Sequence, residues 1–173
     1  EQVDQLIARA EHDQAKLILI KHRLRSSDET QLRIIDQVMS RVESSEQEAE
    51  RRRQVQNAAR RKQLERAKAF IEREKFEEAV SELETFQGKS GEGDEAAVLR
   101  ERALEGLINR ERNRAARLFL KAKETEDPDR KEAYLRSSYQ ILKSLVDKYP
   151  SSPLSEKVRS NLETVEEALR EIT

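Results

Sequence analysis

Two stretches with the same hydrophobic spacing decide the fold of this chain: residues 76–86 read FEEAVSELETF, and residues 135–145 read LRSSYQILKSL. In each stretch a large apolar residue is followed by a small residue three positions later, and then by large apolar residues after four and three more positions. The members are Phe76, Ala79, Leu83 and Phe86 in the first stretch, and Leu135, Ser138, Leu142 and Leu145 in the second. Steps of three and four place side chains on one face of an α-helix. We therefore predict two helices whose small residues allow a close helical neighbour.

A small residue followed by an aromatic residue three positions later lies upstream of each stretch. The pairs are Ala67 with Phe70, and Ala116 with Phe119. Each pair indicates a first helix that folds back on the second as an antiparallel hairpin. Hairpins that cannot bury their apolar faces alone stack on their neighbours to complete a core. The repeated spacing therefore predicts stacked helical hairpins.

The segment from Ala67 to Ala79 resembles a tetratricopeptide repeat (TPR). Ala67 and Ala79 stand at the small positions of the family's two helices, and Phe70 and Phe76 at its aromatic positions. The run 139–153, which ends Tyr-Pro-Ser-Ser-Pro, is similar to repeats of bacterial cell-envelope proteins, including outer-membrane assembly and cell-division lipoproteins. The resemblance covers residues 57–172. It implies a scaffold that binds peptides or partner domains, usually on a concave face, and a periplasmic or cell-envelope location, with the cytoplasm as the alternative.

The chain departs from the family pattern at three places. Gln63 stands where a large residue is expected early in the first helix, Ser138 replaces the usual Ala, and residues 124–130 form an insertion. We therefore describe the expected hairpins as TPR-like.

The N-terminal part predicts a further helical hairpin. Its first helix is expected to have one apolar face, formed by Val3, Leu6, Ile7, Ala10, Leu17, Ile20 and Leu24, with the small Ala15 between them. The second helix is expected to bury Leu32, Ile35, Val38, Met39 and Val42. Ser26 and Glu29 between the two helices have the spacing of a capping box.

Residues 43–62 carry many charges and no Gly or Pro, so helix is expected to continue there by propensity. Ser45 with Glu48 could instead start a new helix, and continuity stays open at this point. The expected domains are residues 1–56, an N-terminal hairpin with a charged connecting helix, and residues 57–173, TPR-like hairpins with a C-terminal capping helix. The fold class is therefore all-α: antiparallel helical hairpins in a TPR-like α-solenoid.

The boundaries of the later helices follow from turn and cap residues. A turn is expected at Glu74-Lys75, and Asp94 after the glycine-rich segment 88–93 is expected to cap the next helix. Asp127-Pro128 is expected to start another helix, because Pro suits the first helical position. Ser152-Pro153 is expected to cap the last.

Nothing in the sequence points to catalysis, a cofactor or a metal. The chain has no Cys, which excludes disulfides and thiolate ligands. His12 and His22 are ten residues apart, not the four that put two imidazoles on one helical face, and are interpreted as surface residues. Gly88-Lys89-Ser90 precedes the other glycines and follows no strand, so it is interpreted as a flexible loop rather than a phosphate-binding loop. We expect a non-enzymatic protein with no catalytic residue, cofactor or metal site.

Charge varies along the chain although the formal net charge is only −1. Residues 45–75 hold ten Lys or Arg against six Asp or Glu, whereas residues 76–100 hold two against seven. No aromatic residue accompanies Arg51–Arg53 or Arg60–Lys62 to stack on bases, so nucleic-acid binding is not expected. No apolar run approaches the roughly 20 residues that span a bilayer, so membrane insertion is not expected either. The chain begins with Glu1, and we expect an upstream segment to have been removed.

The expected function is a scaffold or adaptor that holds a protein or peptide partner in a groove formed by the first helices of the hairpins. Polar residues of those helices are the candidate partner-binding residues: Arg66, Arg73, Arg110 and Arg117. The alternative is a structural oligomer, in which the N-terminal hairpin pairs with another copy as a helical bundle.

Overall fold

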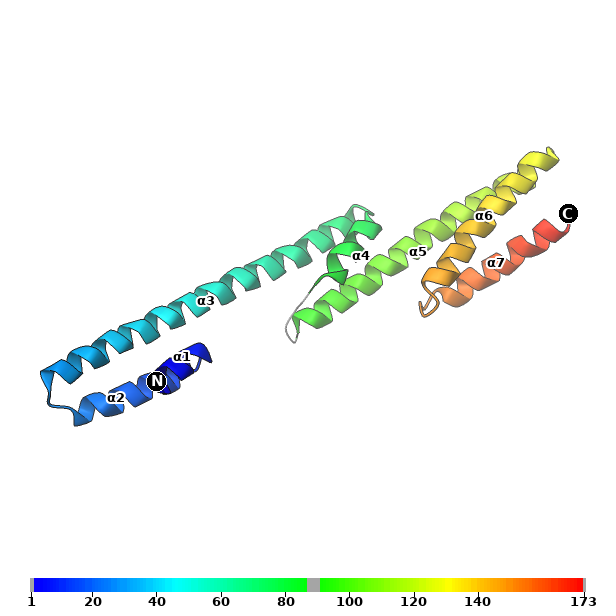
Figure 1. Cartoon of the computed structure of the whole chain (residues 1–173). Coiled ribbons are helices and arrows are strands. Elements are labelled where there is room, and N and C mark those ends of the chain that lie inside the picture. Colours follow the sequence, from blue (N-terminus) through cyan, green and yellow to red (C-terminus); the bar gives the residue numbers. More distant parts are fainter. Residues whose placement is uncertain (1, 87–90, 173) are drawn as a thin grey trace. The chain divides into compact units, whose positions relative to one another are not determined.

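The computed structural model describes residues 2–86 and 91–172, which form seven α-helices and no strand (Figure 1). The all-α class is thus confirmed for the described residues. The helices are α1 (Gln2–Ala8), α2 (His12–Arg25), α3 (Glu29–Glu72), α4 (Phe76–Glu84), α5 (Glu92–Glu124), α6 (Pro128–Lys148) and α7 (Ser155–Arg170).

The chain folds as two compact units, Glu1–Arg61 and Lys62–Thr173. We call them unit 1 and unit 2. Helix α3 supplies its first part to unit 1 and its last turns to unit 2. It is one continuous helix of 44 residues, so Ser45 does not start a new helix. At its N-terminus the cap is Asp28, whose Oδ1 accepts a hydrogen bond from the backbone N–H of Thr30 at 2.9 Å.

Unit 1 is an antiparallel pair, α2 and the first part of α3, with the short α1 packed against it. Of the five residues expected to be buried on α3, Val42 is buried, and Ile35, Val38 and Met39 are partly buried against the same cluster. Leu32 is partly buried but does not belong to this cluster. On α2 the expected face is wrong. Ala15 and Leu19 are buried, whereas three residues assigned to the buried face are exposed: Leu17, Ile20 and Leu24. The run of four apolar residues at 17–20 fits either face, and Leu19, not Leu17, follows Ala15 by four residues.

The first expected helix is broken between α1 and α2, although no Gly or Pro marks the break. Ala10 adopts φ +59°, and the N–H groups of Ala10 and Glu11 donate to the carbonyls of Ile7 and Leu6 at 3.0 and 2.9 Å. This pattern of two bonds around a left-handed residue closes the helix C-terminus. The break lets α1 fold back on the pair, where Asp4 binds Arg41 of α3 at 3.3 Å.

The same device ends α3 at the predicted turn. Glu74 has φ +56°, its N–H donates to the carbonyl of Ile71 at 3.1 Å, and that of Lys75 donates to Phe70 at 2.9 Å. The chain then reverses into α4, so the end of α3 and α4 form a hairpin. Its core joins residues of α3, α4 and α5: Leu64, Ala67, Ile71, Ala79, Leu83, Ala96, Leu99 and Ala103, with Phe70, Phe76, Val80 and Phe86 packed against them.

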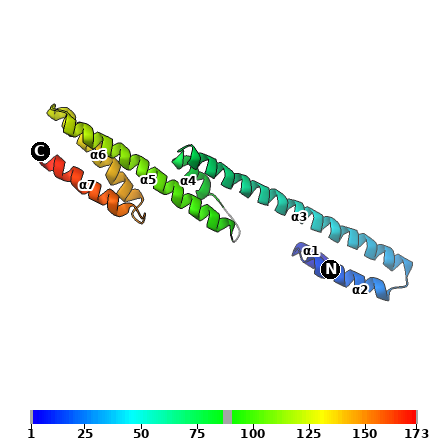
Figure 2. The same ribbon diagram turned by 180° about the vertical axis from the view of Figure 1, so that it is seen from behind.

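The second cluster of unit 2 lies among α5, α6 and α7, which lie side by side in both ribbon views (Figures 1 and 2). The four residues predicted to share one face of the 135–145 stretch are all buried: Leu135, Ser138, Leu142 and Leu145. Ser138 has no exposed surface, and its Oγ donates a hydrogen bond of 2.9 Å to the carbonyl of Ala115. The buried hydroxyl of Ser138 therefore has a hydrogen-bond partner.

The small residue predicted on α5 is off by one position. Ala115 is fully buried against α6, whereas Ala116 is exposed. Two adjacent alanines offer the same small side chain, and only the position of α6 chooses between them. The close approach predicted from Ala116 is made by Ala115.

Cap predictions for the later helices differ in outcome. Asp127 caps α6 through the N–H groups of Asp129 and Arg130 at 3.0 and 3.2 Å, with Pro128 in the first turn, as predicted. Helix α5 begins at Glu92, so Asp94 lies inside it and is not its cap. The cap expected for α7 at Ser152-Pro153 is wrong, because the N-cap residue of α7 is Leu154 and no side chain caps this helix. Ser152 instead accepts a hydrogen bond from the N–H of Leu154, just before the helix. The loop expected at Gly88-Lys89-Ser90 lies outside the described residues.

Candidate functional site

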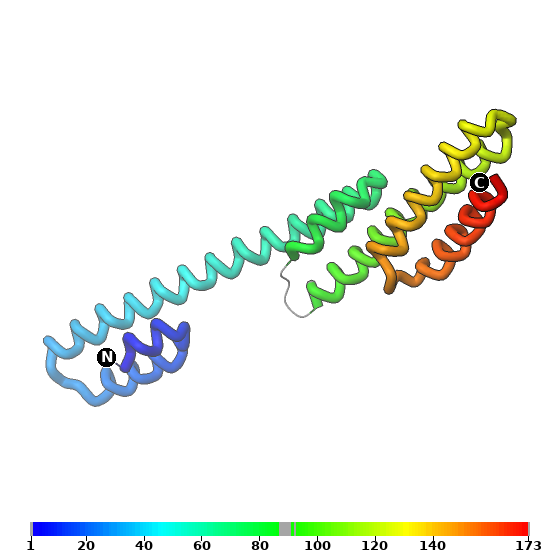
Figure 3. Tube along the Cα trace, turned by 45° about the vertical axis from the view of Figure 1, so that its right-hand side comes forward, coloured from blue at the N-terminus to red at the C-terminus, as the bar shows by residue number. Residues whose placement is uncertain are grey.

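A groove of about 770 Å³ runs along unit 2 between α5 and α6. From α5 its lining includes Leu107, Glu111, Arg114, Leu118 and Lys121, spaced by four, three, four and three residues. From α6 it includes Ser137, Ile141, Ser144 and Lys148, spaced by four, three and four. These spacings make one continuous face on each helix. Five further residues complete what we call the α5–α6 groove: Arg117, Gln140, Leu145, Tyr149 and Glu77 of α4. Figure 3 shows the two helices side by side.

The floor of the groove is apolar. Leu107 and Leu145 are 6% exposed, while Leu118 and Ile141 remain half-buried and accessible. From Leu107 to Lys121 the lined part of α5 extends about 21 Å at 1.5 Å per residue. The groove is therefore long enough for a helix of about four turns.

The carboxylates of the groove are held by arginines. Arg110 binds Glu77 of α4 and, through Nε, Oε1 of Glu111 at 3.2 Å. Its guanidinium also lies 5.8 Å from the centre of the Phe76 ring and donates to the carbonyl of Glu74 at 3.3 Å. The hydrogen bond from Arg110 lowers the pKa of Glu77 below its usual value. Both carboxylates are thus paired with arginines.

Three cations of the groove have no such partner. Among the described residues, no carboxylate lies within ion-pairing distance of Arg117, Lys121 or Lys148, whereas Arg114 binds Glu111 at 3.4 Å. Lys121 has an aromatic contact instead, 6.0 Å from the ring centre of Tyr134. The groove therefore presents a net positive, uncompensated charge above an apolar floor.

The structure separates the four arginines that the sequence suggested. Arg66 of α3 is exposed and binds Glu82 of α4 at 2.6 Å. Arg73 is exposed just after α3, in the turn before α4. Arg110 joins α5 to α4. Of the four arginines, Arg117 lines the α5–α6 groove, and no carboxylate of the described residues pairs with it. Lys121, Lys148 and Ile141 were not singled out from sequence, although the four-three spacing on α5 and α6 could have found them.

Gln63, a polar residue at a position where the sequence led us to expect a large one, bonds to the end of α4. Its Nε2 donates to the carbonyl of Glu82 at 2.7 Å and to Oγ1 of Thr85 at 3.1 Å. Arg100 of α5 donates to the carbonyl of Leu83 at 3.0 Å. Side chains from α3 and α5 thus satisfy the C-terminal carbonyls of the short α4.

His12 is not the surface residue expected. It is 8% exposed, and its Nε2 lies 3.1 Å from Oγ of Ser45, which joins α2 to α3. His22 is exposed. Within residues 2–86 and 91–172, no three His, Asp or Glu side chains form a group that could hold a metal ion.

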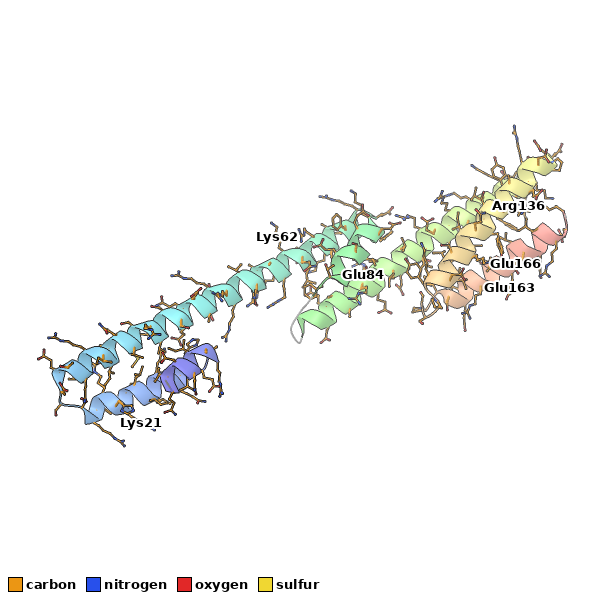
Figure 4. All side chains as sticks on the ribbon, in the orientation of Figure 1. Lys21, Lys62, Glu84, Arg136, Glu163 and Glu166 are labelled. Atoms are coloured by element: carbon orange, nitrogen blue, oxygen red, sulfur yellow. The ribbon has the colours of Figure 1, made fainter. Side chains whose placement is uncertain are left out.

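The charged surfaces of both units lie outside the cores. Lys21 on α2, Lys62 on α3 and Arg136 on α6 are examples of exposed charges (Figure 4). Arg52 pairs with Glu48 one turn away at 2.5 Å, the i,i+4 arrangement expected for the basic segment. None of the described helices combines the length and apolar character needed to cross a bilayer.

Comparisons with protein-family models, with curated proteins and with solved structures give no match for this chain.

Proposed function

We propose that the chain is a non-enzymatic scaffold or adaptor, and that unit 2 binds a protein partner in the α5–α6 groove. The observation that carries the proposal is the groove itself: accessible apolar side chains between two helices, bordered by unpaired cations. Exposed apolar surface of this kind marks interaction sites when it is continuous and has a polar rim.

A TPR-like arrangement is part of the same proposal. It is supported by the contacts between successive helices, since α4 packs on α5, α5 on α6 and α6 on α7. It is also supported by the buried small residues at the crossings, Ala67, Ala79, Ala115 and Ser138. Helix α5 has 33 residues, which is long enough for its first half to pack against α4 and its second half against α6.

The proposal that the chain is not an enzyme is supported by the ion pairs of the groove carboxylates, Glu77 and Glu111. A general acid at neutral pH needs a raised pKa. The pKa of Glu77 is lowered by its hydrogen bond from Arg110, and Glu111 is bound by both Arg110 and Arg114. These carboxylates are arranged to hold helices together rather than to exchange protons.

Photo-cross-linking in the producing cell tests the partner proposal. A photoreactive residue in place of Ile141 in the groove is expected to capture a defined protein, and the same residue in place of the exposed Glu163 on α7 is not. Equal capture from both positions, or none from Ile141, would count against a partner in this groove.

A second candidate function is self-association through unit 1. On α2 the exposed residues Leu17, Ile20 and Leu24 are spaced by three and four, the spacing of a coiled-coil seam. Because α2 is apolar on two faces and α3 covers one, the other is available to the same seam of a second copy. Sedimentation should then show a dimer that Leu17→Gln with Leu24→Gln dissociates. A monomer at high concentration would remove this candidate.

A place in the bacterial cell envelope is proposed on the resemblance of residues 139–153 alone. Fractionation of cells producing the full-length protein tests it, and recovery in the cytoplasm would favour the alternative location.

A further inference from the structure

We infer that the occupant of the α5–α6 groove is an acidic amphipathic helix. The inference rests on the proposed function and adds the chemistry of the partner. It is drawn from the shape, the floor and the charge of the groove.

The shape of the groove fits a helix. Two antiparallel helices carry facing rows at four-three spacing, with Leu118 on α5 and Ile141 on α6. A third helix can place its own i, i+3, i+4 and i+7 side chains between such rows. The lined length of about 21 Å corresponds to about 14 residues of such a helix.

The charge of the groove selects an acidic partner. Its acidic members, Glu77 and Glu111, are already neutralised by Arg110 and Arg114. Its remaining cations are Arg117, Lys121 and Lys148, for which the described part of the chain supplies no carboxylate. Glu or Asp flanking an apolar stripe would complement them, whereas Lys or Arg would be repelled.

Both ends of the groove carry a cation. Lys148 is at the C-terminus of α6 and Lys121 is near the C-terminus of the antiparallel α5. A partner with acidic residues distributed along its length therefore fits better than one with a single terminal carboxylate.

Fluorescence anisotropy with two labelled probes tests the inference on the whole chain. The acidic probe is a 16-residue helical peptide with a Leu stripe and Glu on its flanks, and its twin has Lys in place of every Glu. We expect the acidic probe to bind, the basic twin not to, and the affinity to fall as salt rises.

The charge-neutral variant Arg117→Gln, Lys121→Gln, Lys148→Gln should bind the acidic probe about tenfold more weakly, as expected for three exposed charge pairs. The matched control removes three exposed arginines from other faces of unit 2, Arg102→Gln, Arg159→Gln and Arg170→Gln, and should bind as the parent does. Circular dichroism verifies that both variants are folded.

Three results overturn the inference: neither probe binds, both bind alike, or the control weakens binding as much as the groove variant. Capture of a partner at Ile141 together with any of these results would leave the proposed function standing and exclude the acidic helix. Binding of the acidic probe without capture at Ile141 would support the groove chemistry and count against the proposed function in that cell.

Discussion

The ring of Phe76 on α4 lies against Gly106 of α5 so closely that a Cβ at position 106 would come within 2.3 Å of its Cε1. The absence of a side chain at Gly106 thus allows Phe76, the first residue of the 76–86 stretch, to pack against α5. Arg110, one turn later, covers the same ring and binds Glu77. The hairpin of α3 and α4 is docked on α5 at this point.

Gly106→Ala tests this docking, because its effect on the stability of unit 2 should change sign when Phe76 is replaced by Ala. Ala favours a helix over Gly by about 1 kcal/mol, but the clash with Phe76 should cost about 1–3 kcal/mol. We expect the substitution to destabilise unit 2. In the background of Phe76→Ala the clash is gone, and the same substitution should stabilise unit 2 by up to about 1 kcal/mol.

Tyrosine fluorescence is the measurement, because Tyr134, Tyr139 and Tyr149 all lie in unit 2 and the chain has no Trp. Urea unfolding of the parent, Gly106→Ala, Phe76→Ala and the double variant gives a double-mutant cycle. The same effect of Gly106→Ala in both backgrounds would contradict the contact.

Leucine scanning of the adjacent alanines tests which residue of α5 faces α6. Ala115→Leu should overpack the contact with Ser138 and cost about 1–3 kcal/mol. Ala116→Leu, on the exposed side, should change the free energy of unfolding by less than about 0.5 kcal/mol. A larger loss of stability from Ala116→Leu than from Ala115→Leu would instead support Ala116, the residue predicted from sequence.

Glu74→Gly should stabilise the turn between α3 and α4. Glu74 has φ +56°, which costs an L-residue about 1 kcal/mol and glycine almost nothing. Part of that gain is offset by the greater freedom of glycine in the unfolded chain, so about 0.5 kcal/mol is expected. Glu72→Gly, at the last residue of α3, is the control and should destabilise, because this residue is already helical and gains nothing from glycine. Both are measured by the same fluorescence transition, and a loss of stability in Glu74→Gly would contradict the turn.

The ion pair of Glu77 and Arg110 predicts a dependence of stability on pH. The hydrogen bond from Arg110 lowers the pKa of Glu77 in the folded chain below its usual value of 4.5. Its contribution is therefore present above pH 4.5 and is lost as the pH falls through the folded pKa. Because Glu77 is half-exposed, the contribution should not exceed about 1 kcal/mol.

Unfolding of the parent and of Glu77→Gln at pH 7 and pH 3 measures this contribution. The difference between the two proteins should be present at pH 7 and shrink at pH 3. A difference that stays constant, or grows on acidification, would show that the pair does not stabilise unit 2.

Much of the helical framework was accessible from sequence because its signals are local. Asp127-Pro128 has the chemistry of a helix start, and the turn at Glu74 follows from the change of apolar face before Phe76. Residues whose roles depend on tertiary packing were missed. Ala10 breaks a helix without Gly or Pro, and the choices of Ala115 over Ala116 and Leu19 over Leu17 are made by the neighbouring helix.

The candidate site was harder to predict from sequence than the helices, because it also depends on tertiary packing. Arg66, Arg110 and Arg117 look alike in sequence, but Glu82 and Glu77 of α4 pair with the first two and leave Arg117 in the groove. Which of these arginines are already paired depends on carboxylates of another helix, 16 residues away from Arg66 and 33 from Arg110, so spacing along one helix could not separate them.

Charge reversal of the groove tests the central claim most directly. The variant Arg117→Glu, Lys121→Glu, Lys148→Glu is compared with the parent for binding of the acidic probe and its basic twin. We predict that the parent prefers the acidic probe and the variant the basic one. A variant that still prefers the acidic probe would show that α5 and α6 do not form the binding surface.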